Sequence, residues 1–239
     1  MLTLCRALLL RAPSAGQRSY SATSLQNFIV QHTEVVSEHL TPELRLHLLT
    51  PRCKHWHLPS DLWPYEDPYW AIYWPGGQAL ARYILDNPDV VRMRRVLDLG
   101  CGCGAAGIAA EMNGASYVLA NDIDPVAGAA FSLNCQLNNL KPLAFSTENI
   151  LAREGENWNL IVLGDMFYDE KLADHLHLWL RHCIAKHKTQ VLIGDPGRFQ
   201  FVSHPIQKQL KKMAEYSLPE CIQQENYGLT ATAVWCYEP

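Results

Sequence analysis

From about residue 76 onward, short apolar runs alternate with longer segments in which apolar residues recur at helical spacing. Five of the runs predict strands: Arg95 to Leu99, Tyr117 to Ala120, Leu143 to Ser146, Leu160 to Leu163 and Gln190 to Ile193. Helices are predicted between them near residues 76 to 86, 104 to 113, 126 to 139 and 170 to 186. Such alternation implies an α/β fold with a parallel sheet and right-handed crossovers.

The C-terminal part of the chain has a different pattern. A helix is predicted at roughly residues 204 to 214, and the segments Glu215 to Gln224 and Thr230 to Tyr237 have the pattern of two strands around Asn226-Tyr227-Gly228. Because their connection is short, these strands must pair antiparallel. The sheet is therefore expected to be mostly parallel, with a C-terminal antiparallel hairpin.

The part that precedes the alternation divides into two segments. Residues 1–20 contain three arginines and no acidic residue, a composition typical of a mitochondrial transit peptide that ends near Tyr20. Residues 21–75 are expected to form an extension packed on the core, with a helix from about Ser24 to Leu49 and a Trp- and Pro-rich stretch from Pro51 to Pro75. Residues 76–239 then form the main domain, and the mitochondrial matrix is the expected compartment.

Composition excludes several classes of function. A chain of 239 residues with 48% hydrophobic and 18% charged residues is expected to form one large domain. Its net charge of -4 lacks the excess of basic residues that neutralises nucleic-acid phosphates. The leader's apolar run from Ala7 to Leu10 is too short to span a membrane. The eight cysteines include no Cys-x-x-Cys pair, so no metal site is expected.

A glycine-rich loop follows the first predicted strand of the alternation. Gly100, Gly102 and Gly104 are spaced two apart, and glycines let a cofactor approach the backbone closely. The spacing also satisfies the dinucleotide fingerprint, so NAD is an alternative. However, Asp98 at the strand end would repel a pyrophosphate, whereas its carboxylate can hold the ammonium and sulfonium of S-adenosylmethionine (SAM). The residues therefore favour SAM over NAD, and the antiparallel hairpin favours the seven-strand, Rossmann-like methyltransferase fold.

Further polar residues follow the next two predicted strands. Ligands of open α/β sheets bind beyond the carboxyl ends of the strands. Asp122 could accept hydrogen bonds from both ribose hydroxyls, whereas Asp124 precedes Pro125 and is well placed as a helix N-cap. Asn149 could present an amide to the adenine edge, or it could simply form a turn.

The fourth strand of the alternation leads into Asp165 and Tyr168, where a substrate would meet the cofactor. Methyl transfer to nitrogen requires an oriented lone pair and exclusion of water. A lysine amine is mostly protonated at the start, so Asp165 could hold the ammonium and guide its deprotonation through water, while Tyr168 adds a hydrogen bond and an aromatic face. The alternative role for Asp165 is a cap for the helix that begins near Glu170.

Several strings together resemble the family of seven-strand protein lysine methyltransferases, over about residues 25 to 239. They are the glycine loop, Asp165-x-x-Tyr168, Trp74-Pro-Gly-Gly-Gln, Ala-Asn-Asp-Ile-Asp-Pro and Ile-Gly-Asp-Pro-Gly-Arg. The resemblance implies SAM as methyl donor and, as protein substrate in the matrix, the β subunit of the electron transfer flavoprotein, methylated up to trimethyllysine. It also implies that Trp74 contacts the cofactor, whereas the residues alone assign both Trp70 and Trp74 to core packing. Both roles stay open for Trp74, and Trp70 is assigned to packing.

Other functions stay open at this point. The chain could be a small-molecule methyltransferase or an NAD enzyme, or a non-catalytic SAM-fold protein that binds the flavoprotein. The segment Gly194 to Arg198 could shape the substrate rim, or it could equally be a turn made by proline and glycine.

Overall fold

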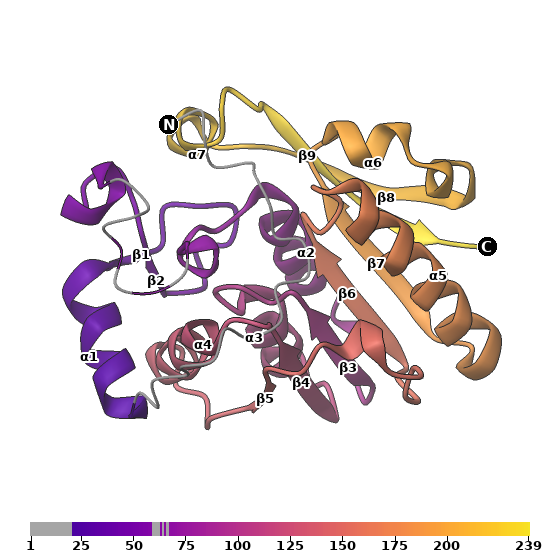
Figure 1. The fold of residues 1–239 in the computed structure, drawn as a ribbon, viewed down its shortest axis with the longest axis horizontal. Helices are drawn as coiled ribbons and strands as arrows, with labels where there is room; N and C mark the ends of the chain where they lie inside the picture. The colour runs from indigo at the N-terminus through magenta and orange to yellow at the C-terminus, as the bar shows by residue number, and fades with distance from the viewer. Residues whose placement is uncertain (1–20, 59–62, 64, 66) are drawn as a thin grey trace.

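The structure is a computed structural model that describes residues 21–58, 63, 65 and 67–239, with a seven-stranded sheet at its centre (Figure 1). The strands are β3 (Arg95–Leu99), β4 (Tyr117–Asn121), β5 (Ala144–Ser146), β6 (Leu160–Gly164), β7 (Gln190–Asp195), β8 (Leu210–Ser217) and β9 (Ala231–Tyr237). Their order across the sheet is β5-β4-β3-β6-β7-β9-β8. Strands β3 to β7 pair parallel, whereas β9 pairs antiparallel with both β7 and β8. The predicted mostly parallel sheet with a C-terminal antiparallel hairpin is confirmed.

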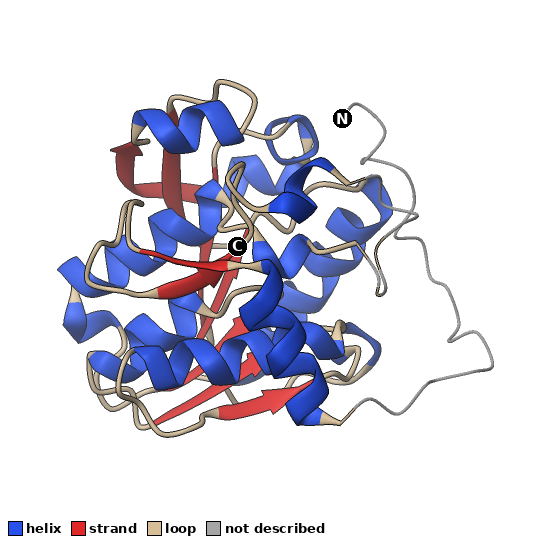
Figure 2. Cartoon of the chain, turned by 90° about the vertical axis from the view of Figure 1, so that its left-hand side faces the viewer, coloured by secondary structure: helices blue, strands red, loops and turns tan. Residues whose placement is uncertain are grey.

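Helices cover both faces of this sheet (Figures 1 and 2). The α-helices are α1 (Ala22–His32), α2 (Pro75–Asp86), α3 (Ala105–Met112), α4 (Pro125–Leu137), α5 (Glu170–His187), α6 (Phe199–Ser203) and α7 (Glu220–Glu225). Short 3-10 helices cover Lys54–His57, Tyr69–Ala71, Pro88–Val90, Ile150–Ala152 and Pro205–Gln209.

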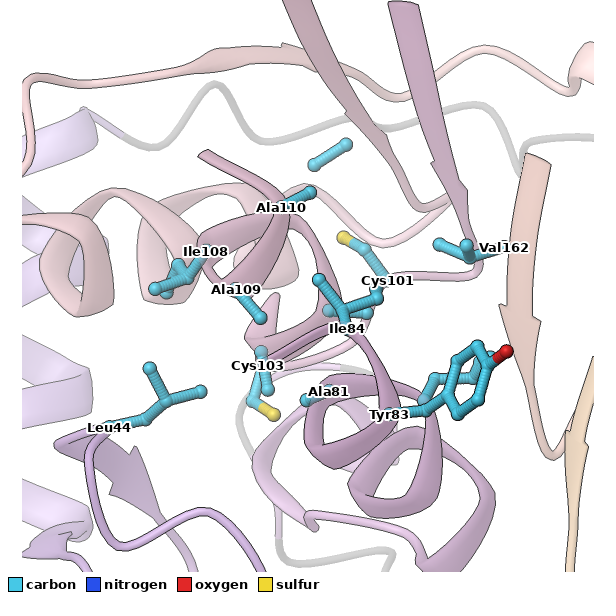
Figure 3. Close-up of a cluster of buried hydrophobic side chains, with 14 of the residues drawn as sticks. Leu44, Ala81, Tyr83, Ile84, Cys101, Cys103, Ile108, Ala109, Ala110 and Val162 are labelled. Carbon is cyan, nitrogen blue, oxygen red and sulfur yellow. The ribbon is translucent and has the colours of Figure 1, made fainter. Parts of the chain in front are cut away.

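The two faces of the sheet bury alternate residues of the same strands. Val96 and Val162 contribute to a cluster with α2 and α3, part of which is drawn in Figure 3. Leu97 and Ile161 point to the other face and pack with α5. Strands buried on both faces read as continuous apolar runs, which is why the central strands are predictable from the sequence.

The order of the strands also locates the ligand crevice. After β3 the chain adds β4 and β5 on one side of it, and then returns to add β6 and β7 on the other. The order therefore reverses between β3 and β6, and α/β sheets bind ligands beyond the carboxyl ends of the strands at such a point. Asp98 lies near the end of β3, and Asp165 directly follows β6.

The N-terminal helix is shorter than the sequence predicts. Helix α1 ends at His32, and strands β1 (Glu34–Val36) and β2 (Leu46–Leu48) pair antiparallel in the region expected to be helical up to Leu49. The side chain of Asn134 on α4 accepts a hydrogen bond from the backbone N–H of His47 at 2.7 Å. A long-range contact of this kind overrides local helix preference.

The predicted helix at 204 to 214 is also wrong. Its region contains the whole Pro205–Gln209 3-10 helix and the start of β8. The segment predicted as the strand Glu215 to Gln224 begins in β8, but its second half belongs to α7. Lys211 and Lys212 lie on β8, which is the edge strand beside β9. Charged residues are common on edge strands because they discourage pairing with other chains, and here they hide the strand's alternation.

Candidate active site

The glycine loop between β3 and α3 has the backbone expected of a cofactor cradle. Gly100, Gly102 and Gly104 have φ angles of 65°, 51° and 78°, in the left-handed region that other residues rarely enter. A Cβ atom on Gly104 would lie 2.1 Å from the ring of Phe131, so this position excludes any side chain. The loop therefore follows a path that requires glycine and brings bare backbone to the end of β3.

Asp98 lies beneath this loop with only 3% of its surface exposed. Its Oδ2 accepts a hydrogen bond from the backbone N–H of Gly107 at 2.8 Å. Burial raises the pKa of the Asp98 carboxyl to about 7, with a contribution from the charge of Asp122 and an opposing one from the Gly107 hydrogen bond. A buried carboxyl in this state gains by pairing with a cation, as the ammonium of a methionine moiety would allow.

Asp122, just after β4, lies against the same loop. Its Oδ2 accepts a hydrogen bond from Gly102 N–H at 3.0 Å, and its Oδ1 accepts one from Asp124 N–H at 3.0 Å. Each carboxylate oxygen can accept two hydrogen bonds, so capacity for hydroxyl donors remains. The Asp124 side chain accepts from Val126 N–H at 2.8 Å and caps α4, which confirms its interpretation as an N-cap.

Asn149 belongs to a loop whose shape is set by a buried neighbour. The Asn121 amide donates to the carbonyls of Ser146 and Glu148, both at 2.9 Å. Asn149 itself is exposed and precedes the 3-10 turn at Ile150–Ala152, without a side-chain capping bond. Its amide thus stays at the surface beyond the end of β5. The glycine cradle, the buried Asp98 and the partly buried Asp122 together fit a ligand with a cationic end and hydroxyl groups, as SAM has.

Asp165 is the most heavily bonded side chain of the site. It is 6% exposed and has a left-handed φ of 56°. Its Oδ2 accepts from Gly76 N–H at 2.5 Å and Gly77 N–H at 3.2 Å. Its Oδ1 accepts from Nε and Nη2 of Arg198 at 3.0 and 2.7 Å. Burial raises the pKa of the Asp165 carboxyl, while the guanidinium of Arg198 and the glycine amides oppose that rise.

The alternative role of Asp165, as a cap for α5, is wrong. Asp169 is the N-cap of α5, because its side chain accepts from Leu172 N–H at 3.0 Å. Asp165 instead reaches the start of α2, whose own N-cap residue, Trp74, makes no side-chain capping bond. It therefore ties the first turn of α2 to the end of β6.

Glycines let α2 approach the sheet closely enough for this contact. A Cβ atom on Gly164 would lie 2.6 Å from the backbone nitrogen of Gly77, and one on Gly194 would lie 2.0 Å from the carbonyl oxygen of Gly76. Real Cβ atoms essentially never lie so close to backbone. The glycines of the strings Trp-Pro-Gly-Gly, Leu-Gly-Asp and Ile-Gly-Asp thus meet at one place, where the start of α2 lies against the ends of β6 and β7.

The two tryptophans before α2 have different environments. Trp70 is 3% exposed and packs in a cluster with Leu25 and Ile29, which confirms its packing role. Trp74 is only partly buried, and its indole N–H donates to the carbonyl of Tyr69 at 3.0 Å. The guanidinium of Arg198 lies over the Trp74 ring, 5.3 Å from its centroid.

Asp195 and Arg198 lie in the segment that the sequence offers as a substrate rim or a turn, without a role for either side chain. Asp195, at the end of β7, accepts through Oδ1 from the backbone N–H groups of Gly197 and Arg198, both at 2.7 Å. Its Oδ2 is buried without a hydrogen-bond partner in the described part of the chain, and burial with the charge of Asp165 raises the pKa of this carboxyl to about 7. The segment from Gly194 to Arg198 is therefore both a turn and part of the site.

Tyr168 completes the group at the end of β6, with 43% of its surface exposed. Partial burial and the charges of Asp122 and Asp169 raise the pKa of its phenol to about 12. The hydroxyl thus keeps its proton at neutral pH and can donate it to a hydrogen bond.

Within the described ranges, no three His, Cys, Asp or Glu residues gather as a metal site, and no helix is both long and apolar enough to cross a membrane.

Comparison with known proteins agrees with this fold. The family model for ribosomal protein L11 methyltransferase matches residues 79–164. A solved ribosomal protein L11 methylase from Lactobacillus delbrueckii subsp. bulgaricus has the same fold, with a TM-score of 0.50 and 21% identity over 70% of this chain and 81% of that one. A solved structure titled as a putative methyltransferase complexed with SAH, the demethylated form of SAM, gives a TM-score of 0.51 at 13% identity, over 69% of this chain and 50% of that one.

Two curated relatives are similar along nearly their whole length. The electron transfer flavoprotein beta subunit lysine methyltransferase of Xenopus laevis is 66% identical over 92% of this chain and 89% of that protein. The protein of that name from Homo sapiens is 59% identical over 96% of this chain and 88% of that protein. SAM is accordingly the cofactor, and the resemblance seen in the motifs is confirmed. The chain belongs to the family of electron transfer flavoprotein beta subunit lysine methyltransferases.

Proposed function

We propose that this protein transfers methyl groups from SAM to lysine side chains of the electron transfer flavoprotein β subunit in the mitochondrial matrix, up to trimethyllysine. The observation that carries the proposal is 59 to 66% identity to four relatives of that name, each over at least 90% of this chain. The site geometry supports it, because an acidic acceptor site lies beside a cradle for a cationic cofactor.

The cofactor residues have separate roles in this proposal. When bound, SAM supplies a methyl group activated by its sulfonium. Asp98 holds the ammonium of the methionine moiety, and Asp122 accepts hydrogen bonds from the ribose hydroxyls. Gly100, Gly102 and Gly104 let the cofactor lie against the backbone. Trp74 and Asn149 stay predicted cofactor contacts.

Asp165 and Tyr168 form the acceptor side. A lysine amine with a reference pKa near 10.4 arrives mostly protonated, and a carboxylate attracts it in that form. Asp165 would orient the ammonium while a water takes one of its protons, which frees the nitrogen lone pair that methyl transfer requires. Asp165 suits this role because its Oδ2 is fixed by the amides of Gly76 and Gly77. Positioning, rather than simple proton abstraction, is thus its contribution.

The proposal is tested by incubating the purified protein with SAM and the purified flavoprotein β subunit, and by mapping methylated lysines with mass spectrometry. We expect mono-, di- and trimethylated forms of the same lysines to appear in order. Methylation of small molecules alone would favour the small-molecule alternative, and binding of the β subunit without any methylation would favour the non-catalytic one.

Tyr168→Phe should reduce methyl transfer only modestly. The variant keeps the ring and loses one hydroxyl, whose hydrogen bond is worth about 1 kcal/mol, so we expect a decrease of about fivefold. Single-turnover transfer at saturating SAM measures it, with Tyr227→Phe as a matched control, since that tyrosine is 73% exposed on the turn before β9. A loss as large as that of an Asp165 variant would make Tyr168 the main acceptor-site residue instead.

The compartment depends on the leader, which lies outside the described residues. Arg6, Arg11 and Arg18 in an acid-free segment should direct import, and processing near Tyr20 should remove them. We therefore expect a version that begins at Ser21 to stay in the cytosol. Fluorescence microscopy compares the two forms, and a truncated form found in mitochondria would show that the import signal lies outside residues 1–20.

A further inference from the structure

Arg198 lies in a seat that has the chemistry of a cation-binding site. One wall is the Oδ1 atom of Asp165, to which two guanidinium nitrogens donate at 3.0 and 2.7 Å. The other wall is the ring of Trp74, whose centroid lies 5.3 Å from the guanidinium carbon. A carboxylate and an indole face are the two groups that bind organic cations best, including methylated ammonium groups.

The acceptor role of Asp165 creates a conflict with this arrangement. Its Oδ2 already accepts from two backbone amides, and its Oδ1 already accepts from two nitrogens of Arg198. These four bonds fill the usual capacity of a carboxylate. An incoming ammonium can therefore reach Asp165 only if one of the present donors leaves.

Arg198 is the donor that is free to leave. The amides of Gly76 and Gly77 belong to the first turn of α2 and cannot move without the helix. The Arg198 side chain is 23% exposed, and its guanidinium lies at the end of a flexible aliphatic chain. Its backbone is held separately, because Asp195 accepts from Arg198 N–H at 2.7 Å. Rotation of one side chain thus opens the seat while the loop stays in place.

From this geometry we propose that the Arg198 guanidinium occupies the binding site of the substrate's lysine ammonium, which is the seat formed by Asp165 and Trp74. The lysine ammonium displaces the guanidinium from this seat when the substrate binds. The proposal rests on the proposed function, since it assumes that the acceptor is a protein lysine. Before substrate binds, the guanidinium keeps the buried carboxylate paired, which avoids the cost of an unpaired buried charge. Any substrate must then bring a cation of its own.

The indole of Trp74 gives the seat a second property. Each methyl group added to the lysine nitrogen removes one N–H donor, so hydrogen bonds to Asp165 are lost one by one. Attraction of the cation to an aromatic face does not need N–H groups and persists for a quaternary ammonium. The seat can therefore hold mono-, di- and trimethyllysine in turn, with Trp74 fixed by its bond to the carbonyl of Tyr69 at 3.0 Å.

Two variants test the displacement, Arg198→Ala and Arg198→Met, the second of which keeps an apolar stem against Trp74. Binding of the flavoprotein β subunit is measured by calorimetry without SAM at about pH 9, because burial raises the pKa of the Asp165 carboxyl and a higher pH favours its ionised form. If the guanidinium fills the seat in about nine of ten molecules, its removal should tighten binding about tenfold. Arg92→Ala is the matched control, because its pair with Asp89 is 58% and 88% exposed, and it should change nothing.

Small cations separate displacement from a scaffolding role. Guanidinium chloride at low millimolar concentration should raise the melting temperature of Arg198→Ala, and it should compete with the β subunit for that variant. Butyltrimethylammonium should stabilise Arg198→Ala as well, but not the variant that also carries Trp74→Ala. Weaker binding of the β subunit in both Arg198 variants, restored by guanidinium, would make Arg198 a scaffold. Unchanged binding in both variants would show that the guanidinium does not compete with the lysine, and either result would overturn the proposal.

The same measurements distinguish failure of this proposal from failure of the proposed function. If the wild-type protein neither binds nor methylates the β subunit, the proposed substrate is wrong. The melting temperatures of Arg198→Ala with butyltrimethylammonium then still decide whether Asp165 and Trp74 form a cation seat, and no stabilisation by that probe would refute it.

Discussion

Replacing Asp165 with asparagine should lower methyl transfer by at least about 10²-fold, the scale expected for a group that positions the reacting atom. Asparagine keeps the shape and one acceptor oxygen, so it can still receive the amides of Gly76 and Gly77. It loses the negative charge that attracts an ammonium and that pairs with Arg198 at 2.7 Å. The chemistry should therefore suffer far more than the fold.

Single-turnover methyl transfer at saturating SAM measures this loss, with SAM affinity determined separately so that weak cofactor binding cannot imitate it. Asp169→Asn is the matched control from the same loop. Asp169 caps α5, and asparagine is an equally good N-cap, so that variant should transfer at nearly the normal rate. Near-normal transfer by Asp165→Asn would remove Asp165 from the acceptor site.

Asp98→Asn should weaken SAM binding by at least about tenfold, because a hydrogen bond to a charged group is worth about 1.5 to 3 kcal/mol. The pKa of the Asp98 carboxyl is raised to about 7 in the cofactor-free protein. A cationic ammonium prefers the ionised form, which becomes dominant as the pH rises through that value. SAM affinity should thus increase between about pH 6 and pH 8 in the wild type, and this increase should flatten in the variant.

Calorimetry over this pH range gives both results, with Asp89→Asn as a control because its side chain is 88% exposed at a surface ion pair. NAD should show no binding, since a buried carboxylate at the end of β3 opposes a pyrophosphate. Unchanged SAM affinity in a folded Asp98→Asn protein, or NAD binding at this site, would contradict the role of Asp98.

The core of the fold was accessible from the sequence because its signals are local. The predicted strand Arg95 to Leu99 agrees with β3 at both ends, and the predicted helix at 170 to 186 agrees with α5 to within one residue. Continuous apolar runs and helix caps carry that information within a few residues. The glycine loop is equally local, since left-handed backbone at Gly100, Gly102 and Gly104 requires glycine itself.

The parts that the sequence did not reveal depend on contacts between distant residues. Strand β2 is held by Asn134, 87 residues further along the chain, and Arg198 meets Asp165 across 33 residues. No local pattern marks such partners. Glycines at positions 76, 164 and 194 were a usable signal, because Gly164 and Gly194 each precede an aspartate at the end of a strand and Gly76 lies at the start of α2, where close backbone contact needs glycine.

We propose that this chain methylates lysines of the electron transfer flavoprotein β subunit. The most direct measurement is incubation of the protein with isotope-labelled SAM and a mitochondrial extract, followed by identification of every labelled protein and residue by mass spectrometry. Label should appear on lysines of the electron transfer flavoprotein β subunit, and should be absent with Asp165→Asn. Label on a different protein, on a small molecule or on residues other than lysine would contradict the account.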